Sequence, residues 1–227
     1  MPYKIIFMGT PQFSVPVLES LVKSSYQISC VYTQSPKKSN RGQKLNPSPI
    51  QNCAENLKLA IRSPNNLNTE VELKFFKKIN PDIVVVVAYG QLISKKFLNI
   101  PKKGFINIHA SLLPKWRGAA PIQRAIINLD KETGVSIMKI KEELDSGPVM
   151  KKIKIDINPS DTSALISEKL SKISSEHIVG ALNDIFNKKD KFTEQDHDNS
   201  TYAKKIKKNE AKVNWSENAK NIIGKIN

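Results

Sequence analysis

The run Ile83–Val87, IVVVV, is the feature that most limits how this chain can fold. Successive side chains of a strand point to opposite faces, so five consecutive β-branched apolar residues leave neither face suited to water. Such a strand is typical of the interior of a parallel sheet that is covered on both sides. The run therefore predicts a central parallel strand.

The chain before residue 130 alternates between predicted strands and predicted helices. Strands are expected at residues 4–8, 28–33, 60–63, 83–87 and 104–110, and helices after Pro11 and at residues 50–59, 69–79, 92–98 and 121–129. In the helix at 69–79, apolar spacing predicts that Val71, Phe75 and Phe76 face inward. This alternation predicts an α/β fold with a doubly wound, mostly parallel sheet and right-handed crossovers.

The pattern changes after Gly134. Residues 135–140 and 149–157 predict two antiparallel strands at the edge of the sheet. Asp161-Thr162-Ser163 predicts the cap of a helix that continues to about residue 187. A long polar loop is predicted at residues 34–49. In the polar tail, a short strand is predicted at 211–215 and a helix at 219–226.

Charge and composition limit the partners of the 227-residue chain. It has 36 Lys and Arg against 21 Asp and Glu, a net charge of +15. This excess favours a polyanion such as nucleic acid, although a lysine-rich proteome would give the same bias. No apolar run approaches the ~20 residues of a membrane helix, and the first residues read as a strand, not as a secretory signal. With only Cys30 and Cys53, a reduced cytoplasm is the expected location.

Several common kinds of active site are not supported by the sequence. Gly9-Thr10-Pro11 lacks the further glycines of a dinucleotide fingerprint, and the sequence has no P-loop. Ser111 has no G-x-S-x-G context, and no His, Cys and carboxylate cluster has metal-ligand spacing. His177 and His197 are expected to be ordinary surface residues.

Asn107 and His109 interrupt the apolar strand predicted at 104–110. Two residues apart, they share one face and lie roughly 6–7 Å apart near the carboxyl end of the strand. Ligands of open α/β sheets bind outside the carboxyl ends of the strands. An amide and an imidazole there can stabilise a carbonyl oxygen as it becomes an oxyanion. The alternative is a hydrogen-bonded pair that merely ends the strand.

Asp145 is the third candidate. It lies in the turn E-E-L-D-S-G, which a sheet of this kind can bring back over His109. A carboxylate beside an imidazole fixes the tautomer of the ring and can help to move a proton. The alternative is a turn aspartate that is selected only for its local hydrogen bonding.

The pattern N-x-H-x-S-L-L-P-x-x-R-G, followed downstream by D-S-G, resembles that of the folate-dependent formyltransferases. The resemblance implies transfer of a formyl group from 10-formyltetrahydrofolate to an amine without a metal. It implies that Asn107 and His109 stabilise the oxyanion and that Asp145 assists proton transfer. The residues expected along the folate site are Ser111, Leu112, Leu113, Pro114, Tyr89 and Gly90.

Four further stretches resemble the methionyl-tRNA branch of this family: FMGTPQFSVPVLESL, QSPKKSNRGQKLNPSPI, VVVVAYGQLI and WRGAAPIQRAI. The resemblance extends to AKVNWS in the tail. It implies that the amine acceptor is methionyl initiator tRNA, used for translation initiation. Separately, a monomer is expected. The residues expected to contact the tRNA acceptor stem are Lys37, Lys38, Arg41, Gly42 and Lys44; a solvated loop is the alternative.

The same resemblance divides the chain into two parts. Residues 1–190 are expected to form the catalytic domain, and residues 191–227 a linker and the start of a shortened C-terminal tRNA-binding domain. Two other functions remain open at this point. One is formylation of the amine of a nucleotide sugar, and the other is tRNA binding without catalysis.

Overall fold

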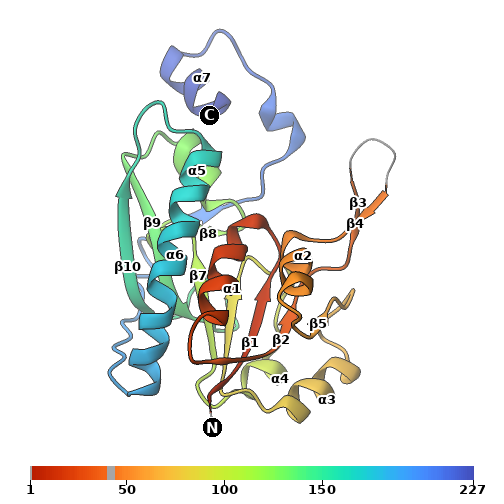
Figure 1. Ribbon diagram of the computed structural model, residues 1–227. Helices are drawn as coiled ribbons and strands as arrows, with labels where there is room; N and C mark the ends of the chain where they lie inside the picture. The colour runs from red at the N-terminus through yellow and green to blue at the C-terminus, as the bar shows by residue number, and fades with distance from the viewer. Residues whose placement is uncertain (1, 40–43) are drawn as a thin grey trace.

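The computed structural model describes residues 2–39 and 44–227. A seven-stranded sheet with the order β10-β9-β7-β6-β1-β2-β5 organises the fold (Figure 1). Its strands are β1 (Lys4–Gly9), β2 (Gln27–Tyr32), β5 (Ile61–Arg62), β6 (Ile83–Val87), β7 (Phe105–His109), β9 (Glu132–Lys139) and β10 (Val149–Asp156). Two small two-stranded sheets add β3 (Lys37–Ser39) with β4 (Lys44–Asn46), and β8 (Arg117–Gly118) with β11 (Tyr202–Ala203).

The helices follow the strands in the predicted alternation. They are α1 (Val15–Val22), α2 (Pro49–Asn56), α3 (Glu70–Ile79), α4 (Lys95–Leu98), α5 (Pro121–Ile127), α6 (Ser163–Phe186) and α7 (Ala219–Ile226). Two 3-10 turns, η1 (Gln12–Ser14) and η2 (Lys208–Ala211), complete the set. No helix of the described residues is long and apolar enough to cross a membrane.

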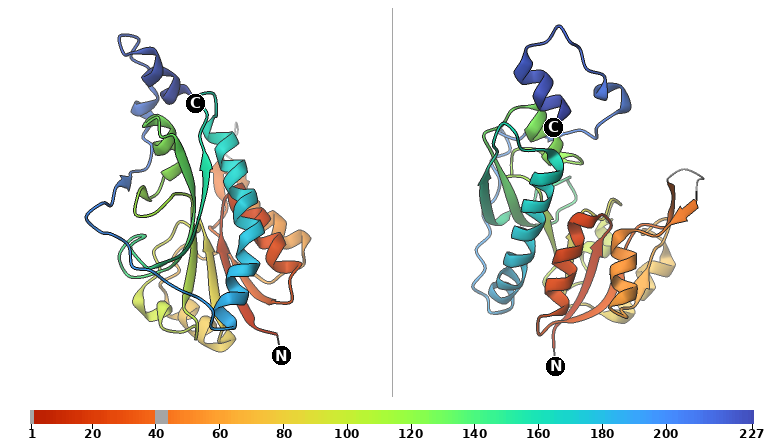
Figure 2. Two further views of the ribbon diagram at one scale, coloured as in Figure 1. Left: turned by 90° about the vertical axis from the view of Figure 1, so that its left-hand side faces the viewer. Right: turned by 45° about the horizontal axis from the view of Figure 1, so that its top comes forward.

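The mostly parallel sheet confirms the predicted fold class. Strand β1 pairs in parallel with β2 and β6, and β6 pairs in parallel with β7. Strand β9 runs antiparallel to both β7 and β10, which gives the predicted antiparallel edge. Helices α1, α2, α5 and α6 contribute to the apolar cluster on one face, and α3 and α4 to the cluster on the other. Figure 2 shows α6 lying along the sheet beside α1.

Strand β6 lies between β1 and β7, and all five of its residues are buried. Its side chains alternate between the two clusters, with Val85 and Val87 on the α1–α6 side and Val84 and Val86 on the α3–α4 side. The prediction of a central strand covered on both faces is confirmed. Burial here also explains why the sequence of this strand contains no polar residue.

The inward face predicted for α3 is wrong at one position. Val71 is 68% exposed, whereas Glu72 and Leu73 are buried. Glu72 can be buried because Arg62 and the hydroxyl of Tyr32 both donate hydrogen bonds to its carboxylate. The hydrogen bond from Arg62 also lowers the pKa of Glu72, which keeps this carboxylate charged.

Two predictions for irregular segments are also corrected. Residues 34–49 are not simply a loop, because β3 and β4 form an antiparallel pair in which Lys38 lies opposite Leu45. The strands of this hairpin pair through main-chain hydrogen bonds. Their sequence is mostly polar, so it shows no apolar alternation from which strands could be predicted. The strand predicted at residues 211–215 is absent. The described chain after η2 pairs with no other strand there, and a β-strand requires such a partner for its backbone hydrogen bonds.

The part of the chain after α6 runs back across the molecule. Thr193 pairs with Val149 through two backbone hydrogen bonds, and β11 pairs in parallel with β8. Helix α7, which ends one residue before the C-terminus, packs near α5 at the top of Figure 1. The predicted helix at 219–226 is confirmed at both ends.

The aromatic cluster beneath α3 should dominate the stability of its side of the sheet. Phe76 is fully buried and contacts the rings of Tyr32, Phe97 and Phe105. Phe76→Ala should lower the free energy of unfolding by about 3–5 kcal/mol, because it removes a buried ring and leaves a cavity. Urea denaturation measures this change. Val71→Ala on the same helix is the control and should change the free energy by less than about 0.5 kcal/mol, because Val71 is exposed.

Candidate active site

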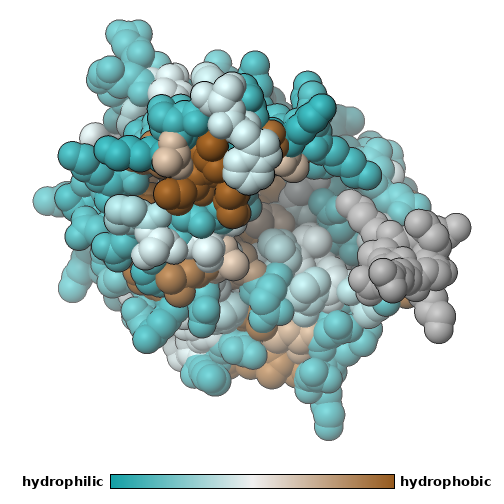
Figure 3. Space-filling view, turned by 90° about the horizontal axis from the view of Figure 1, so that it is seen from above, coloured by the Kyte–Doolittle hydropathy of each residue, from teal (hydrophilic) through white to brown (hydrophobic). Residues whose placement is uncertain are grey.

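The candidate site lies on β7, toward the carboxyl end of the strand. Ile106 and Ile108 pack in the cluster on the α1–α6 side, and Phe105 packs on the α3–α4 side. Asn107 and His109 therefore project from the α3–α4 face, as strand alternation predicts. The parallel strands end toward the top of Figure 1, and the face seen from above is hollowed near its centre (Figure 3).

The turn between β9 and β10 brings Asp145 to these two side chains. Asp145 Oδ1 accepts a hydrogen bond of 3.4 Å from Asn107 Nδ2. Asp145 Oδ2 lies 3.6 Å from His109 Nδ1. The backbone of Asp145 has a φ of +50°, in the left-handed region that few residues other than glycine adopt. The fold thus brings the three predicted catalytic side chains together.

The loop after β7 fixes the histidine and the carboxylate relative to each other. His109 is buried, and its Nε2 lies 2.8 Å from the carbonyl oxygen of Trp116. Because a carbonyl only accepts, Nε2 carries the hydrogen and Nδ1 is the ring nitrogen that faces Asp145. Two residues later, the backbone N–H of Gly118 donates a 2.8 Å hydrogen bond to Asp145 Oδ2.

Ser111 and Leu113, predicted to lie along a folate site, are both fully buried. The hydroxyl of Ser111 donates to the carbonyl oxygen of Lys115, and Leu113 packs against Met138 and Val149. Ser136 ties the loop to β9, since its hydroxyl donates to Ser111 O and accepts from Leu113 N. Ser111 and Leu113 therefore stabilise the conformation of the loop.

Leu112 and Pro114, the other two members of this stretch, are partly exposed. They are the members whose side chains a ligand could reach. The contact of all four residues with folate stays a prediction.

Tyr89 and Gly90 lie directly after β6. The carbonyl oxygen of Tyr89 accepts hydrogen bonds from Thr10 Oγ1 at 2.9 Å and Gln34 Nε2 at 3.0 Å. Gly90 has a φ of +83°, which favours glycine. The Tyr89 side chain is buried, its burial raises the pKa of the phenol, and its hydroxyl has no hydrogen-bond partner among the described residues. The predicted role of both residues in folate binding stays a prediction.

Three of the five predicted nucleic-acid contacts lie on the β3–β4 hairpin. Lys37 and Lys38 belong to β3, and Lys44 begins β4. Arg41 and Gly42 lie outside the described residues. The hairpin stands on the same upper side of the molecule as the C-terminal segment (Figure 1). The role of these five residues stays a prediction.

A groove of about 610 Å³ lies between α5 and the segment from Tyr202 to Glu210. Its lining includes two aromatic side chains and three lysines: Trp116, Tyr202, Lys204, Lys205 and Lys207. Arg124 donates to both carboxylate oxygens of Glu210 across this groove, and this pair lowers the pKa of Glu210 to about 2. Sequence analysis did not predict this groove.

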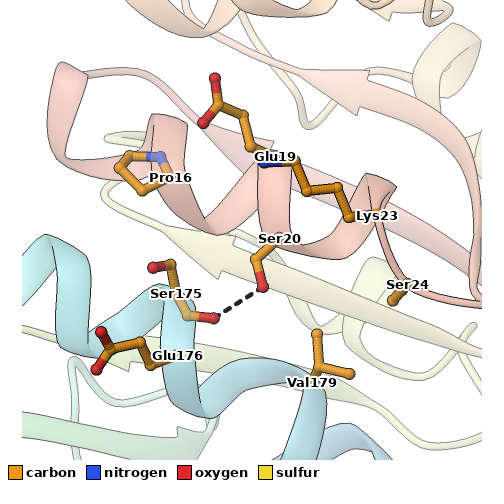
Figure 4. Close-up of a pocket in the computed structure, with 8 residues that line it drawn as sticks. All are labelled: Pro16, Glu19, Ser20, Lys23, Ser24, Ser175, Glu176 and Val179. Atoms are coloured by element: carbon orange, nitrogen blue, oxygen red, sulfur yellow. Dashed lines mark hydrogen bonds between the residues drawn. The ribbon is translucent and has the colours of Figure 1, made fainter.

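A second groove, of about 440 Å³, lies between α1 and α6 (Figure 4). In this groove the hydroxyl of Ser20 donates to the carbonyl oxygen of Ser175. Helices α1 and α6 cover the face of the sheet opposite Asn107 and His109. The groove is therefore separate from the candidate site.

Two residues that sequence analysis did not predict support the site. Arg117 and Gln195 are both buried, and Gln195 bonds to Arg117 and to the backbone of Asp145. Arg117 belongs to the R-G of the sequence pattern, but nothing in the polar stretch around Gln195 distinguishes it from an exposed residue. No group of three or more potential metal ligands occurs in the described part of the chain.

Comparisons with known proteins agree with this site. The sequence model of the formyl transferase family matches residues 3–182. A methionyl-tRNA formyltransferase of Pelagibacter ubique is 57% identical over 228 residues, which cover 100% of this chain and 74% of that protein. A methionyl-tRNA formyltransferase of Coxiella burnetii is 44% identical over 226 residues, covering 100% and 72%.

Among solved structures, the sugar 3N-formyl transferase WlaRD has a TM-score of 0.75 at 20% identity, covering 100% of this chain and 78% of its own. A phosphoribosylglycinamide formyltransferase from Bacillus halodurans has a TM-score of 0.68 at 20% identity, covering 82% and 96%. At 20% sequence identity, these two structures show that the fold is shared, and they say nothing about the substrate of this chain.

Proposed function

Because the chain belongs to the formyl transferase family, we propose that it transfers a formyl group from 10-formyltetrahydrofolate to the α-amine of methionyl initiator tRNA. The sequence identity of 57% over the whole chain to a methionyl-tRNA formyltransferase carries this proposal. The sugar formyltransferase that shares the fold is only 20% identical. The assembled Asn107, His109 and Asp145 favour catalysis over tRNA binding alone.

The donor set of the site fits a formyl oxygen that becomes negatively charged. Asn107 Nδ2 has two hydrogens, of which one points to Asp145 at the long distance of 3.4 Å and the other is free to reach an oxyanion. Because His109 Nε2 donates to Trp116 O, Nδ1 carries no hydrogen in the neutral ring. Nδ1 becomes a donor beside the oxyanion and Asp145 once it has taken up the proton of the attacking amine. Each such donor contributes roughly 3–4 kcal/mol to stabilisation of the transition state.

Asp145 provides the route for the proton. The neutral amine attacks the formyl carbon and must lose one proton as the new C–N bond becomes an amide. Asp145 and His109 receive that proton and return it to N10 of the departing tetrahydrofolate as the old C–N bond breaks. Atoms and charges balance without a covalent enzyme intermediate.

Positive charge on the upper side of the molecule supports a tRNA substrate. The β3–β4 hairpin carries three lysines of the predicted tRNA contact, and the groove beside α5 is lined by three more. Lysine and arginine on such surfaces bind phosphate groups and release counterions. The division into a catalytic domain, residues 1–190, and a following segment, residues 191–227, is part of this proposal, and so is a monomeric state.

Formation of formyl-methionyl-tRNA tests the proposed function directly. With 10-formyltetrahydrofolate and methionyl initiator tRNA, the protein should form the product, and kcat/KM should fall steeply as salt rises because phosphate contacts are screened. A nucleotide sugar with a free amine is the comparison substrate and should not be formylated. Formylation of the sugar and not of the tRNA contradicts the proposal.

Loss of either predicted oxyanion donor should slow the chemical step. Asn107→Ala or His109→Ala should lower kcat by about 10²–10³-fold, because each removes one charge-stabilising donor. Single-turnover kinetics at saturating substrates measure this effect. His177→Ala is the matched control and should retain the wild-type rate, because His177 lies on α6, which covers the sheet face opposite Asn107 and His109. A near wild-type rate in either site variant would rule out the assigned role.

The predicted hairpin contact should appear in the salt dependence of tRNA use. Arg41→Ala should raise KM for methionyl-tRNA and reduce the slope of log(kcat/KM) against log[salt] by about one, because one phosphate contact is lost. The affinity for folate should not change. Lys23→Ala, in the groove between α1 and α6, removes the same charge elsewhere and should leave the slope unchanged. Equal slopes for wild type and Arg41→Ala would argue against this contact.

A further inference from the structure

Gln195 uses its whole hydrogen-bonding capacity inside the protein. The side chain is buried. Its amide nitrogen donates to the carbonyl oxygens of Asp145, at 2.8 Å, and Gly147, at 2.7 Å. Its amide oxygen accepts from Arg117 Nε at 3.1 Å and Nη2 at 2.8 Å. Two donors and two acceptor positions are all that a glutamine offers, so each has a defined partner.

These bonds join the two segments that hold the catalytic pair. On one side, Gln195 binds the backbone of Asp145 itself. On the other side it binds Arg117, whose neighbours Trp116 and Gly118 bond to His109 Nε2 and Asp145 Oδ2. A single side chain therefore connects the turn that carries the carboxylate to the loop that orients the imidazole.

The Asp145 turn depends on this support because much of it is exposed. Residues 141–144 are exposed, and burial begins only near Asp145 and Ser146. Asp145 also adopts the left-handed backbone conformation, which local sterics disfavour for a residue with a Cβ. A conformation of this kind persists where surrounding contacts fix it, and Gln195 supplies two such contacts to the turn.

Gln195 is itself held in place on both sides along the chain. Two residues before it, Thr193 exchanges backbone hydrogen bonds of 2.8 and 2.9 Å with Val149. After it, Thr201 O accepts from the backbone N–H of Arg117 at 2.8 Å. The guanidinium of Arg117 also contacts His197 Nδ1 at 3.3 Å. Residues 193–201, called the strap below, are thus fixed beside the site by these contacts.

We propose that Gln195 is a positioning residue for the reaction: it acts through Asp145 and holds the carboxylate at the distance from His109 and Asn107 that the chemistry needs. Gln195 itself makes no contact with substrate in this role. The inference rests on the proposed formyl transfer and adds a residue from the segment after α6 to the machinery of that reaction. A general role in stability is the alternative, and the two differ in what they predict for variants at Asp145.

The test is a double-mutant cycle between Gln195→Met and Asp145→Asn. Gln195→Met removes all four hydrogen bonds while keeping a similar length and should lower kcat by about 10- to 100-fold, because small displacements of a catalytic group are costly. KM for both substrates should change by less than about twofold. In the Asp145→Asn background the same change should cost less than about threefold, because the carboxylate through which Gln195 acts is already lost.

Glu194→Gln is the matched control. Glu194 precedes Gln195 on the same strap, is exposed, and pairs with Lys141 at the start of the same turn. Its replacement loosens the strap from the turn without affecting Asp145 and should retain the wild-type kcat. If Gln195→Met does not fold, Gln195→Glu takes its place, because its carboxylate still accepts from Arg117 but cannot donate to Asp145 O.

Amide hydrogen exchange provides a readout that needs no substrate. The N–H of Gly118 is protected by Asp145 Oδ2. Its exchange should accelerate at least about tenfold in Gln195→Met and remain unchanged in Glu194→Gln. Unchanged Gly118 protection, or an equal loss of kcat in both Asp145 backgrounds, overturns the positioning role. An inactive wild-type enzyme with the predicted exchange pattern would instead contradict only the proposed function.

Discussion

Burial of β6 on both faces is the constraint on which the rest of the structure depends. A strand of five apolar residues between β1 and β7 has no position at which a polar side chain could be solvated. Helices must therefore cover both sides of the sheet centre, and polar chemistry must move to a neighbouring strand or to a strand end. On the neighbouring strand β7, Asn107 lies opposite Val86 and His109 follows two residues later, and there the candidate site is built.

Main-chain groups do most of the positioning in that site. The carbonyl oxygen of Trp116 sets the tautomer of His109, and the N–H of Gly118 holds the carboxylate of Asp145. Backbone groups of short loops can do this only if the loops themselves are fixed. Buried side chains such as Ser136 and Gln195 provide that fixation from other parts of the chain. The geometry of the three candidate side chains thus depends on residues that lie far away in the sequence.

The fold and the substrate are separate properties of this family. Solved structures of sugar formyltransferases share the fold at about one-fifth identity, so the fold alone does not identify the substrate. What distinguishes this chain is high identity to methionyl-tRNA formyltransferases together with a net charge of +15. Lysines in the groove beside α5 place part of that charge on the upper side of the molecule. A large polyanionic substrate makes use of such a surface, whereas a small sugar does not need it.

The sequence by itself determined the alternation of strands and helices in the main sheet, the central strand and the shared face of Asn107 and His109, because these follow from the local periodicity of side chains. It also indicated Asp145, although only through the resemblance and a turn pattern. It did not reveal the outward position of Val71, because the burial of Glu72 depends on Arg62 and Tyr32 from elsewhere in the chain. Only the tertiary structure decided that Asp145 meets Asn107 across 38 residues, and that Gln195 supports it across 50. Those contacts arise from strand pairing and from the path of the segment after α6, and no local pattern of residues encodes a partner so far away.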